Sequence, residues 1–394
     1  DVVGMALSCN EKNYYISINT MQEWEEGRDW LASADYNKII YDVKRTKILL
    51  EKSDLLFLGG TFDVLLAAYL LNPSEAQLDL STIVSHYLEE VLPTDDEVYG
   101  KGAKRNVFQE KELMDHLCRK SSFIHQLVPT LLEKLKEDDL HSILCDLELP
   151  LSYMLCGMEQ QGVSVDKVRL DELGVELKRC SEELTEEIYQ IAGTDFNINS
   201  PKQLGYILFE KLGLPPIKKT KTGYSTDADV LDKLASQHEI AEKIVHFRQV
   251  CKLLSTYIEG LKKEIHDDQK IHTQFNQTIT ATGRLSSSEP NLQNIPIRME
   301  EGRRIRQVFI PSQQDGVILA ADYSQIELRV LAHLSGDEGL QKAFKEGKDI
   351  HTQTAMDVFG VSEEEVNAEM RRHAKAVNFG IVYGQSDFGL SQSL

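Results

Sequence analysis

Two cations and two aromatic rings recur at a spacing of four residues near the end of the sequence. They are Arg371, Lys375, Phe379 and Tyr383. On a helix, successive members of such a series drift by only about 40° around the axis, so all four side chains share one face. Arg and Lys bind phosphate groups, and aromatic rings stack on bases and sugars. The stripe predicts a face that holds a nucleoside triphosphate; an amphipathic surface helix with a basic rim is the alternative interpretation.

The carboxylate of Asp322 is a candidate metal ligand. It follows an apolar run at 317–321, which predicts a buried strand, and it precedes a predicted helix at 325–333. The carboxyl end of a buried strand is a usual place for a hard cation. Magnesium takes one or two protein carboxylates together with waters and substrate phosphates, which Asp322, a neighbouring backbone group and a triphosphate would supply. The alternative is that Asp322 only caps the following helix and that Glu327 is solvated.

Two further segments carry groups suited to phosphates or bases. His351 stands alone ahead of a predicted helix, where a histidine by itself favours a structural role. Residues 282–298 form a long irregular segment, and loops of this length are usually functional when ordered. Its hydrogen-bonding groups are Arg284, Ser286, Ser287, Asn291, Gln293 and Asn294. Such groups bind phosphate, sugar and base edges, so this segment predicts a nucleic-acid contact.

The elements that would position these groups change in kind along the chain. Up to about residue 121, predicted strands and helices alternate, which indicates an α/β layer domain. Its expected elements are a hairpin at 2–18, a helix at 41–50, a strand at 55–58 and a helix at 62–71. Helices then dominate, at 113–137, 140–157 with a kink or a fresh start at Pro150, and 166–192.

Residues 166–262 are expected to form a helical arm. Its tip at 218–226 is basic, which suits a duplex backbone, although a solvated turn explains the lysines equally well. After residue 271 the composition changes, and a strand is expected at 274–281. The predicted fold class is α/β and α+β, in several domains.

Composition bounds the class of protein. A chain of 394 residues with 41% hydrophobic and 27% charged residues suits two or three globular domains. No apolar run approaches the roughly 18 residues of a membrane span, and the first residues lack the basic region of a signal peptide. Six scattered cysteines without a C-x-x-C pair indicate reduced thiols, so we expect a cytoplasmic protein. A net charge of −20 argues against non-specific coating of nucleic acid, but not against local basic grooves.

Taken together, the segments resemble those of a known family. Residues 282–298 resemble motif 1 of the A-family DNA polymerases, residues 322–329 motif A and residues 371–384 motif B, in the same order and at the same spacing. The likeness extends to residues 99–105, 196–204 and 218–226, and it is strongest to the large fragment of the bacterial type I enzymes of Bacillus, cut within the fingers. It implies five regions: an exonuclease-like domain at 1–121, connecting helices and the start of the palm at 122–165, a thumb at 166–262, palm with motif A at 263–334, and incomplete fingers with motif B at 335–394.

The resemblance implies roles on the phosphates and the metal. Asp322 would be one of two catalytic aspartates bridging two Mg²⁺ ions, with the Tyr323 carbonyl as a further ligand. Arg371 and Lys375 would clamp the triphosphate and stabilise charge on the leaving pyrophosphate. His351 would touch the same phosphates.

It also implies roles on the sugar, the base and the duplex. Phe379 would stack near the sugar and base and discriminate against dideoxynucleotides, and Tyr383 would lie beside the templating pair. Gln325 belongs to the same nucleotide site, and Glu327 would exclude a ribose hydroxyl at C2′. Four residues would line the primer–template, with the first reading minor-groove acceptors: Arg284, Asn291, Gln293 and Asn294.

The implied activity is template-directed DNA synthesis in replication and repair, by a monomer with primer–template DNA and dNTPs as partners and no membrane. The second catalytic aspartate of the family lies in a His-Asp-Glu block that this sequence does not contain. We therefore expect activity to need the missing C-terminal palm segment. The alternative is a DNA-binding fragment that is inactive alone.

The first domain departs from the family's 3′–5′ exonuclease. Asp42 matches its middle metal-binding aspartate, and its first Asp-x-Glu pair would precede Asp1. The final Tyr-x-x-x-Asp is absent, and residues 114–120 are basic where the acid belongs. Because Arg or Lys repels a metal ion, we expect this exonuclease to be inactive, with nuclease activity as the alternative.

Overall fold

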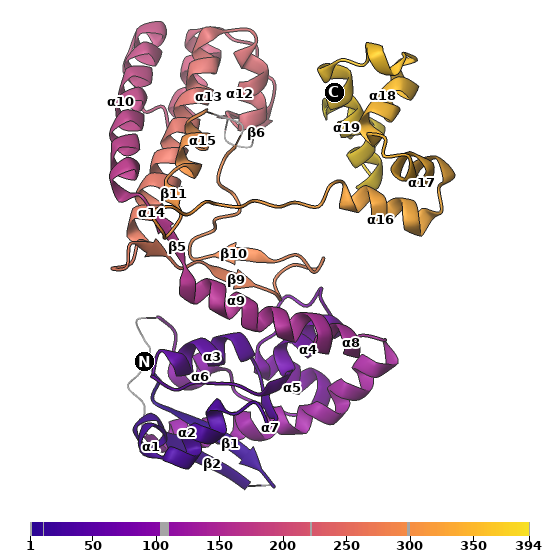
Figure 1. Ribbon diagram of the computed structural model, residues 1–394. Helices are drawn as coiled ribbons and strands as arrows, with labels where there is room; N and C mark the ends of the chain where they lie inside the picture. Colours follow the sequence, from indigo (N-terminus) through magenta and orange to yellow (C-terminus); the bar gives the residue numbers. More distant parts are fainter. Residues whose placement is uncertain (1, 11, 103–109, 221–222, 298–299, 394) are drawn as a thin grey trace. The chain divides into compact units, whose positions relative to one another are not determined.

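The computed structural model describes residues 2–10, 12–102, 110–220, 223–297 and 300–393. It divides into two compact units, residues 1–317 and 318–394. Helices and short strands are mixed in the first unit, and the second consists of helices joined by loops (Figure 1). No helix among the described residues is long and apolar enough to cross a membrane.

The chain begins with the expected hairpin. β1 (Gly4–Cys9) pairs antiparallel with β2 (Lys12–Ser17). β3 (Lys38–Ile40) then pairs in parallel with β4 (Gly60–Asp63), and α3 (Val43–Glu51) lies between them in sequence. Parallel neighbours need such a crossover, so the α/β expectation for this region is confirmed.

The strand expected at 55–58 is wrong. Leu55 and Phe57 of this run are buried in the domain core, and the amide of Leu58 donates to the carbonyl of Leu31 at 3.0 Å. These residues therefore pack into the core but do not form a strand. Pairing with β3 begins only after the left-handed Gly59, at Gly60.

Helices complete this domain around one apolar core. They are α1 (Ile18–Glu23), α2 (Glu25–Ala32), α4 (Val64–Leu71), α5 (Leu80–Leu88), α6 (Asp95–Tyr99) and α7 (Glu110–Glu137). Both α4 and α5 contribute buried side chains, and Leu127, Leu131 and Leu135 of α7 pack into the same core. Since these leucines recur every four residues, α7 presents a single apolar face to the domain.

Asp63 joins β4, α3 and α4. Its carboxylate is 1% exposed and accepts hydrogen bonds from the amides of Val43 (2.7 Å), Leu65 (2.9 Å) and Leu66 (3.1 Å). Burial raises the pKa of Asp63 to about 8, against the opposing effect of these three donors.

Asp63→Ala is expected to destabilise this domain by about 3 kcal/mol, because it leaves buried amides without an acceptor. Asp79→Ala is the matched control: Asp79 is exposed and caps α5 through one bond from the Thr82 amide (2.8 Å), so its loss should cost about 1 kcal/mol. Hydrogen exchange of the α4 amides measures both free energies of unfolding. Equal losses in the two variants would contradict the central role given to Asp63.

The connection to the helical arm runs through α8 (His141–Ile143), a π-helical turn (Leu144–Glu148) and α9 (Leu149–Gln161). Pro150 lies in the first turn of α9, directly after the π-helical turn, and the backbone stays helical on both sides, so the fresh start expected there is wrong and the irregularity lies within one continuous helix. β5 (Val163–Val165) follows and lies between β8 (Lys270–Ile271) and β11 (Phe309–Ile310) in an antiparallel sheet.

The expected helical arm is present. Its elements are α10 (Lys167–Ala192), α11 (Pro201–Gly205), a π-helical turn (Tyr206–Lys211), α12 (Ala228–Ala235), α13 (Glu239–Lys252), a second π-helical turn (Leu253–Ile258) and α14 (Glu259–Lys263). α10 and α13 pack side by side over one apolar core (Figure 1). Asp166 and Ser200 cap α10 and α11 through their side chains, which accept from the amides of Arg169 and Gln203. The basic tip folds as a short hairpin, β6 (Lys219–Thr220) with β7 (Gly223–Tyr224); residues 221–222 lie outside the described part.

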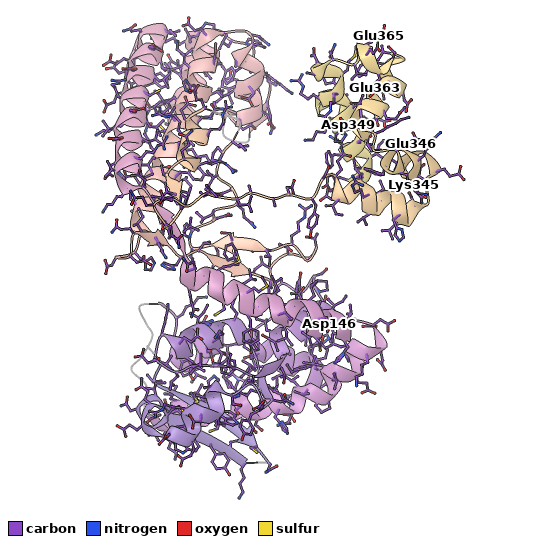
Figure 2. The ribbon with its side chains drawn as sticks, viewed as in Figure 1. Asp146, Lys345, Glu346, Asp349, Glu363 and Glu365 are labelled. Atoms are coloured by element: carbon purple, nitrogen blue, oxygen red, sulfur yellow. The ribbon has the colours of Figure 1, made fainter. Side chains whose placement is uncertain are left out.

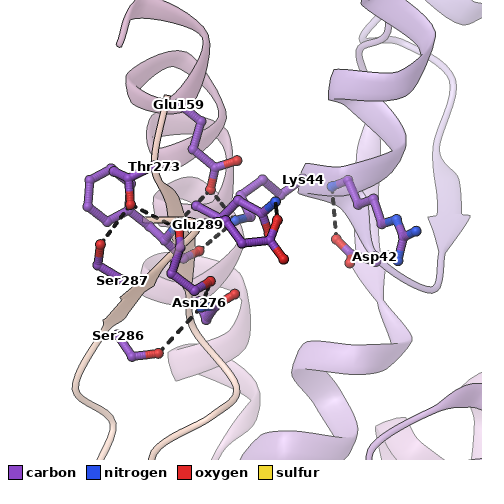
Figure 3. A network of polar contacts seen from close by, with 12 residues as sticks. Asp42, Lys44, Glu159, Thr273, Asn276, Ser286, Ser287 and Glu289 are labelled. Carbon is purple, nitrogen blue, oxygen red and sulfur yellow. Dashed lines mark hydrogen bonds and ion pairs between the residues drawn. The ribbon is translucent and has the colours of Figure 1, made fainter. Parts of the chain in front are cut away.

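The polar segment that follows is mostly loop. β9 (Gln274–Asn276) pairs with β10 (Ser286–Ser288), so the expected strand at 274–281 is shorter than predicted. Thr273 anchors the segment, because its Oγ1 is 2.7 Å from the Ser287 hydroxyl and donates to the Pro290 carbonyl at 2.8 Å. Figure 3 shows this network beside Glu159 of α9, which accepts from the Phe275 amide at 2.8 Å and pairs with Lys44 of α3. α15 (Glu300–Arg306) ends the segment.

The second unit holds α16 (Ile326–Ser335), α17 (Glu338–Lys345), α18 (Ile350–Phe359), a 3₁₀ turn (Glu363–Glu365), α19 (Ala368–Val382) and α20 (Asp387–Ser393). Leu328, Ala343 and Ile350 form its small core. The buried strand expected at 317–321 is wrong: these residues are irregular, and Val317 and Leu319 are 85% and 87% exposed. A strand is stable only beside a partner, and none of the described residues pairs with this run.

Candidate functional site

The basic and aromatic stripe lies on α19. The Asn367 side chain caps this helix by accepting from the amides of Glu369 (3.0 Å) and Met370 (2.9 Å). Lys375 Nζ lies 5.9 Å from the centre of the Phe379 ring. That ring stacks on Tyr383 with centres 6.2 Å apart and planes 13° from parallel. A cation and two rings therefore follow one another along one face, as the spacing predicts.

Arg371 at the other end of the stripe is held by Asp349. The Arg371 Nε donates to Asp349 Oδ2 at 2.6 Å. Asp349 also caps α18 through the His351 amide (3.0 Å) and accepts from the Thr352 hydroxyl (3.1 Å) and from Gln325 Nε2 (3.3 Å). Burial opposes ionisation of this carboxyl, but the hydrogen bonds from Arg371, the His351 amide and Thr352 outweigh it and lower its pKa to about 2. Asp349, labelled in Figure 2, is therefore a full anion at neutral pH.

The His351 side chain is buried, with 3% of the residue exposed. Its Nδ1 lies 3.0 Å from Asn378 Nδ2, and Thr354 Oγ1 donates to Asn378 Oδ1 at 3.0 Å. The amide of Asn378 therefore donates to an unprotonated Nδ1. Burial lowers the pKa of His351, so the ring is neutral at pH 7. These contacts fit the structural role that a lone histidine favours; its contact with phosphates stays a prediction.

Glu327 and Tyr383 meet across two helices. Glu327 lies in the first turn of α16, and its Oε2 accepts from the Tyr383 hydroxyl at 2.6 Å. Gln325 precedes α16 in the left-handed conformation, with φ of 53°, and its side chain contacts Asp349. The structure thus brings four predicted site residues together through two links. Asp349 accepts hydrogen bonds from both Gln325 and Arg371, and Glu327 accepts one from Tyr383.

Asp322 and Tyr323 lie in the exposed segment ahead of α16. Gln325 occupies the N-cap position of α16, without a capping hydrogen bond from its side chain, so the interpretation of Asp322 as the cap of this helix is wrong. Among the described residues, no three His, Cys, Asp or Glu side chains gather closely enough to hold a metal ion. Asp322 and the Tyr323 carbonyl supply oxygen ligands of the kind Mg²⁺ prefers, but only part of a set.

The predicted primer–template residues lie on the loop around β10. Arg284, Asn291, Gln293 and Asn294 are all exposed. Gln293 Nε2 donates to the Leu285 carbonyl at 3.2 Å, and the Gln293 amide donates to Asn291 Oδ1 at 2.9 Å. These bonds order the loop from within while its side chains face solvent, as a surface for a polar ligand requires.

The exonuclease-like domain uses its charged groups internally. Asp42 caps α3 by accepting from the Arg45 amide at 2.9 Å, and burial raises its pKa. In α7, His116 Nε2 and Lys120 Nζ lie 2.9 Å and 3.0 Å from Asp95 Oδ1. A carboxylate faces basic side chains here, which is the reverse of a metal-binding cluster.

Two residues of this site escape prediction from the sequence. Asp349 stands two residues before His351 at the start of a helix, which signals an N-cap but not a contact with Arg371. Asn378 precedes Phe379 inside a helix and gives no signal of its own. Both roles depend on how α16, α18 and α19 pack.

An α/β domain, a helical arm, a polar loop and a helix bearing cations and rings, in this order, define a polymerase fold. The model of DNA polymerase family A matches residues 167–394, and that of the DNA polymerase I ribonuclease H-like domain matches residues 1–127. This chain belongs to DNA polymerase family A. The predicted class, mixed α/β and α+β in several domains, is thereby confirmed.

The relatives are longer than this chain. It is 52% identical over its whole length to DNA polymerase I of Geobacillus stearothermophilus and to that of Bacillus subtilis, and it spans 45% of each. A solved structure, the POL domain of Pol1 from M. smegmatis in complex with DNA primer-template and dNTP, superposes with a TM-score of 0.85 at 36% identity. That match covers 98% of this chain and 65% of the other.

Proposed function

We propose that this chain is the nucleotide-selecting part of a DNA-directed DNA polymerase, which adds deoxynucleotides to a primer 3′-hydroxyl. The observation that carries the proposal is the α19 stripe, where Lys375, Phe379 and Tyr383 contact one another in series and Arg371 is fixed at the basic end. Membership of the family and the likeness to a structure containing primer-template and dNTP support it. The domain boundaries at 121, 165, 262 and 334 are part of the proposal.

The triphosphate would lie at the basic end of the stripe. Arg371 offers a planar fork that matches phosphate oxygens, and Lys375 adds a point charge one turn away. The sugar and base would lie at the aromatic end, where Phe379 and Tyr383 provide stacked faces. At the basic end, Arg371 and Lys375 would stabilise the charge that develops on the leaving pyrophosphate.

Asp322 and the Tyr323 carbonyl would hold magnesium together with the nucleotide. When bound, Mg²⁺ neutralises phosphate charge and favours ionisation of the primer hydroxyl. Asp322 lies shortly before Gln325 and Glu327 in the sequence. Gln325 donates to Asp349 at the start of α18, and Glu327 accepts from Tyr383 at the end of α19. The second aspartate of a two-metal site would come from a palm segment outside this sequence.

The exposed loop around β10 would hold the primer–template. Arg284 would donate to minor-groove acceptors that every correct base pair presents, while Asn291, Gln293 and Asn294 add polar contacts. We propose that this DNA synthesis serves replication and repair, and that the polymerase acts in the cytoplasm as a monomer.

Primer extension with Mg²⁺ and four dNTPs tests the proposal. The full-length polymerase that contains these residues should extend a primed template. The 394-residue chain alone should bind primer–template without extending it, and a separately supplied C-terminal palm segment should restore extension. A full-length protein that does not extend primers would refute the proposal; extension by the 394-residue chain alone would refute only the need for a second segment.

We propose that the exonuclease-like domain is inactive and structural. Its basic face on α7 is engaged by Asp95, and Asp42 serves as a helix cap. A labelled primer with a mismatched 3′ end should keep its length when the full-length protein and Mg²⁺ are present without dNTPs. Shortening that disappears in Asp42→Ala would establish an active nuclease instead.

Glu327→Ala is expected to reduce discrimination against ribonucleotides by about 100-fold, because it removes the side chain proposed to occupy the space of a 2′-hydroxyl. Tyr383→Phe is the matched control, since it removes only the donor of the 2.6 Å hydrogen bond and keeps the ring. It should relax discrimination in the same direction but less. The ratio of kcat/KM for dATP to that for ATP measures both, and an unchanged ratio in Glu327→Ala would exclude this residue as the sugar gate.

A further inference from the structure

One carboxylate connects three helices of the second unit. Asp349 caps α18 through the His351 amide at 3.0 Å, accepts from Gln325 just ahead of α16 at 3.3 Å, and accepts from Arg371 of α19 at 2.6 Å. The shortest of these bonds is the charge-assisted one to Arg371. The position of the Arg371 guanidinium is thus set by a residue of another helix.

The bond to Asp349 uses the inner nitrogen of the guanidinium. Within the described part of the chain, the contacts of Arg371 engage Nε and leave the two terminal nitrogens for a ligand. The Arg371 side chain is 47% exposed, so it is open to solvent despite its bond to Asp349. An arginine held at Nε presents its two terminal donors as a fixed fork, which suits bidentate binding of a phosphate.

We propose that Asp349 is a positioning residue for the nucleotide triphosphate: it fixes Arg371 through Nε so that the terminal nitrogens face the phosphates. The inference rests on the proposed function, because it takes Arg371 as a phosphate ligand. It adds a residue that touches no substrate and acts through Arg371.

The opposite role would make Asp349 a competitor that the triphosphate displaces from Arg371. The contacts of the carboxylate argue against this. Asp349 Oδ1 accepts from the amide that begins α18, and Oδ2 accepts from the Thr352 hydroxyl at 3.1 Å. Movement of Asp349 away from Arg371 would require a rotation that uncaps α18. Asp349 therefore stays in place when Arg371 binds an anion.

The test is the affinity of the 394-residue chain for Mg²⁺–dATP, measured by equilibrium dialysis. Asp349→Asn keeps the size of the side chain and an oxygen for the cap but removes the charge, and it should weaken binding about tenfold. Asp337→Asn is the matched control, because Asp337 caps α17 in the same unit through the Leu340 amide at 2.7 Å and does not contact Arg371. It should leave the affinity within about twofold.

A double-mutant cycle separates positioning from general damage. In the Arg371→Ala background, Asp349→Asn should cause no further loss of affinity. The Arg371 Nε–H signal in ¹⁵N NMR should be protected from exchange in the wild type and in Asp337→Asn, and unprotected in Asp349→Asn. These readouts do not depend on catalysis.

Four results would overturn the inference. Tighter binding by Asp349→Asn would make the carboxylate a competitor. An unchanged affinity, or a loss that persists in the Arg371→Ala background, would show that Asp349 does not act through Arg371. If the wild type binds dATP no better than Arg371→Ala, the proposed nucleotide site itself fails and the inference fails with it; that result is seen without any change at Asp349.

Discussion

Asp322→Ala in the full-length polymerase is expected to lower kcat for primer extension by about 1,000-fold or more. A carboxylate that bridges catalytic magnesium ions contributes several kcal/mol of charge stabilisation in the transition state, and each 1.36 kcal/mol corresponds to a factor of ten. Single-turnover extension of a primed template by one nucleotide measures this rate. Binding of primer–template should be almost unchanged, because the proposed role of the aspartate is to bind the metal and not the duplex.

Asp315→Ala is the control for this experiment. Asp315 lies in the same exposed segment ahead of α16 and carries the same charge, but no role is proposed for it. It should extend primers at the wild-type rate. If Asp322→Ala extends as fast as Asp315→Ala, Asp322 is not a metal ligand, and the assignment of the 322–329 segment to the catalytic palm fails with it.

The sequence predicts best what is determined locally. The α19 stripe follows from four residues spaced by four, and the helix cap at Ser200 follows from the Ser-Pro pair with which α11 begins. Each of these features depends on atoms within a few turns of the same helix. They could be predicted without knowledge of the neighbouring elements.

The predictions from the sequence fail where contacts between distant parts of the chain determine the structure. The apolar run at 317–321 has the composition of a buried strand, but strand formation needs a paired neighbour, and the described residues supply none. His351 also depends on tertiary structure: a lone histidine favours a structural role, but its burial and its contact with Asn378 come from the packing of α18 on α19 and could not be predicted locally. The link between Asp349 and Arg371 joins residues that are 22 apart on different helices, and no local pattern reports it.

Arg371→Ala is expected to lower kcat/KM for every dNTP by about 100- to 1,000-fold, since it removes a donor that we propose stabilises charge developing on the phosphates. Arg372→Ala is a closely matched control. Arg372 is the next residue on α19, but it is 73% exposed and lies 3.6 Å from Glu369, so its loss should change kcat/KM by no more than about twofold. Equal effects of the two changes would show that only the net charge of the helix matters.

The division of the Arg371→Ala effect between kcat and KM identifies when Arg371 acts. A rise in KM with an unchanged kcat would mean that the guanidinium holds the ground-state triphosphate and the transition state equally, whereas a fall in kcat would mean that it binds the developing pyrophosphate more strongly. Arg371→Lys keeps the charge but loses both the fork and the Nε bond to Asp349, so we expect it to fall between the wild type and Arg371→Ala. Because a fork fixed at Nε cannot follow the phosphates as they move, the structure favours an effect mainly on kcat. An effect confined to KM would instead make Arg371 a docking group for the nucleotide.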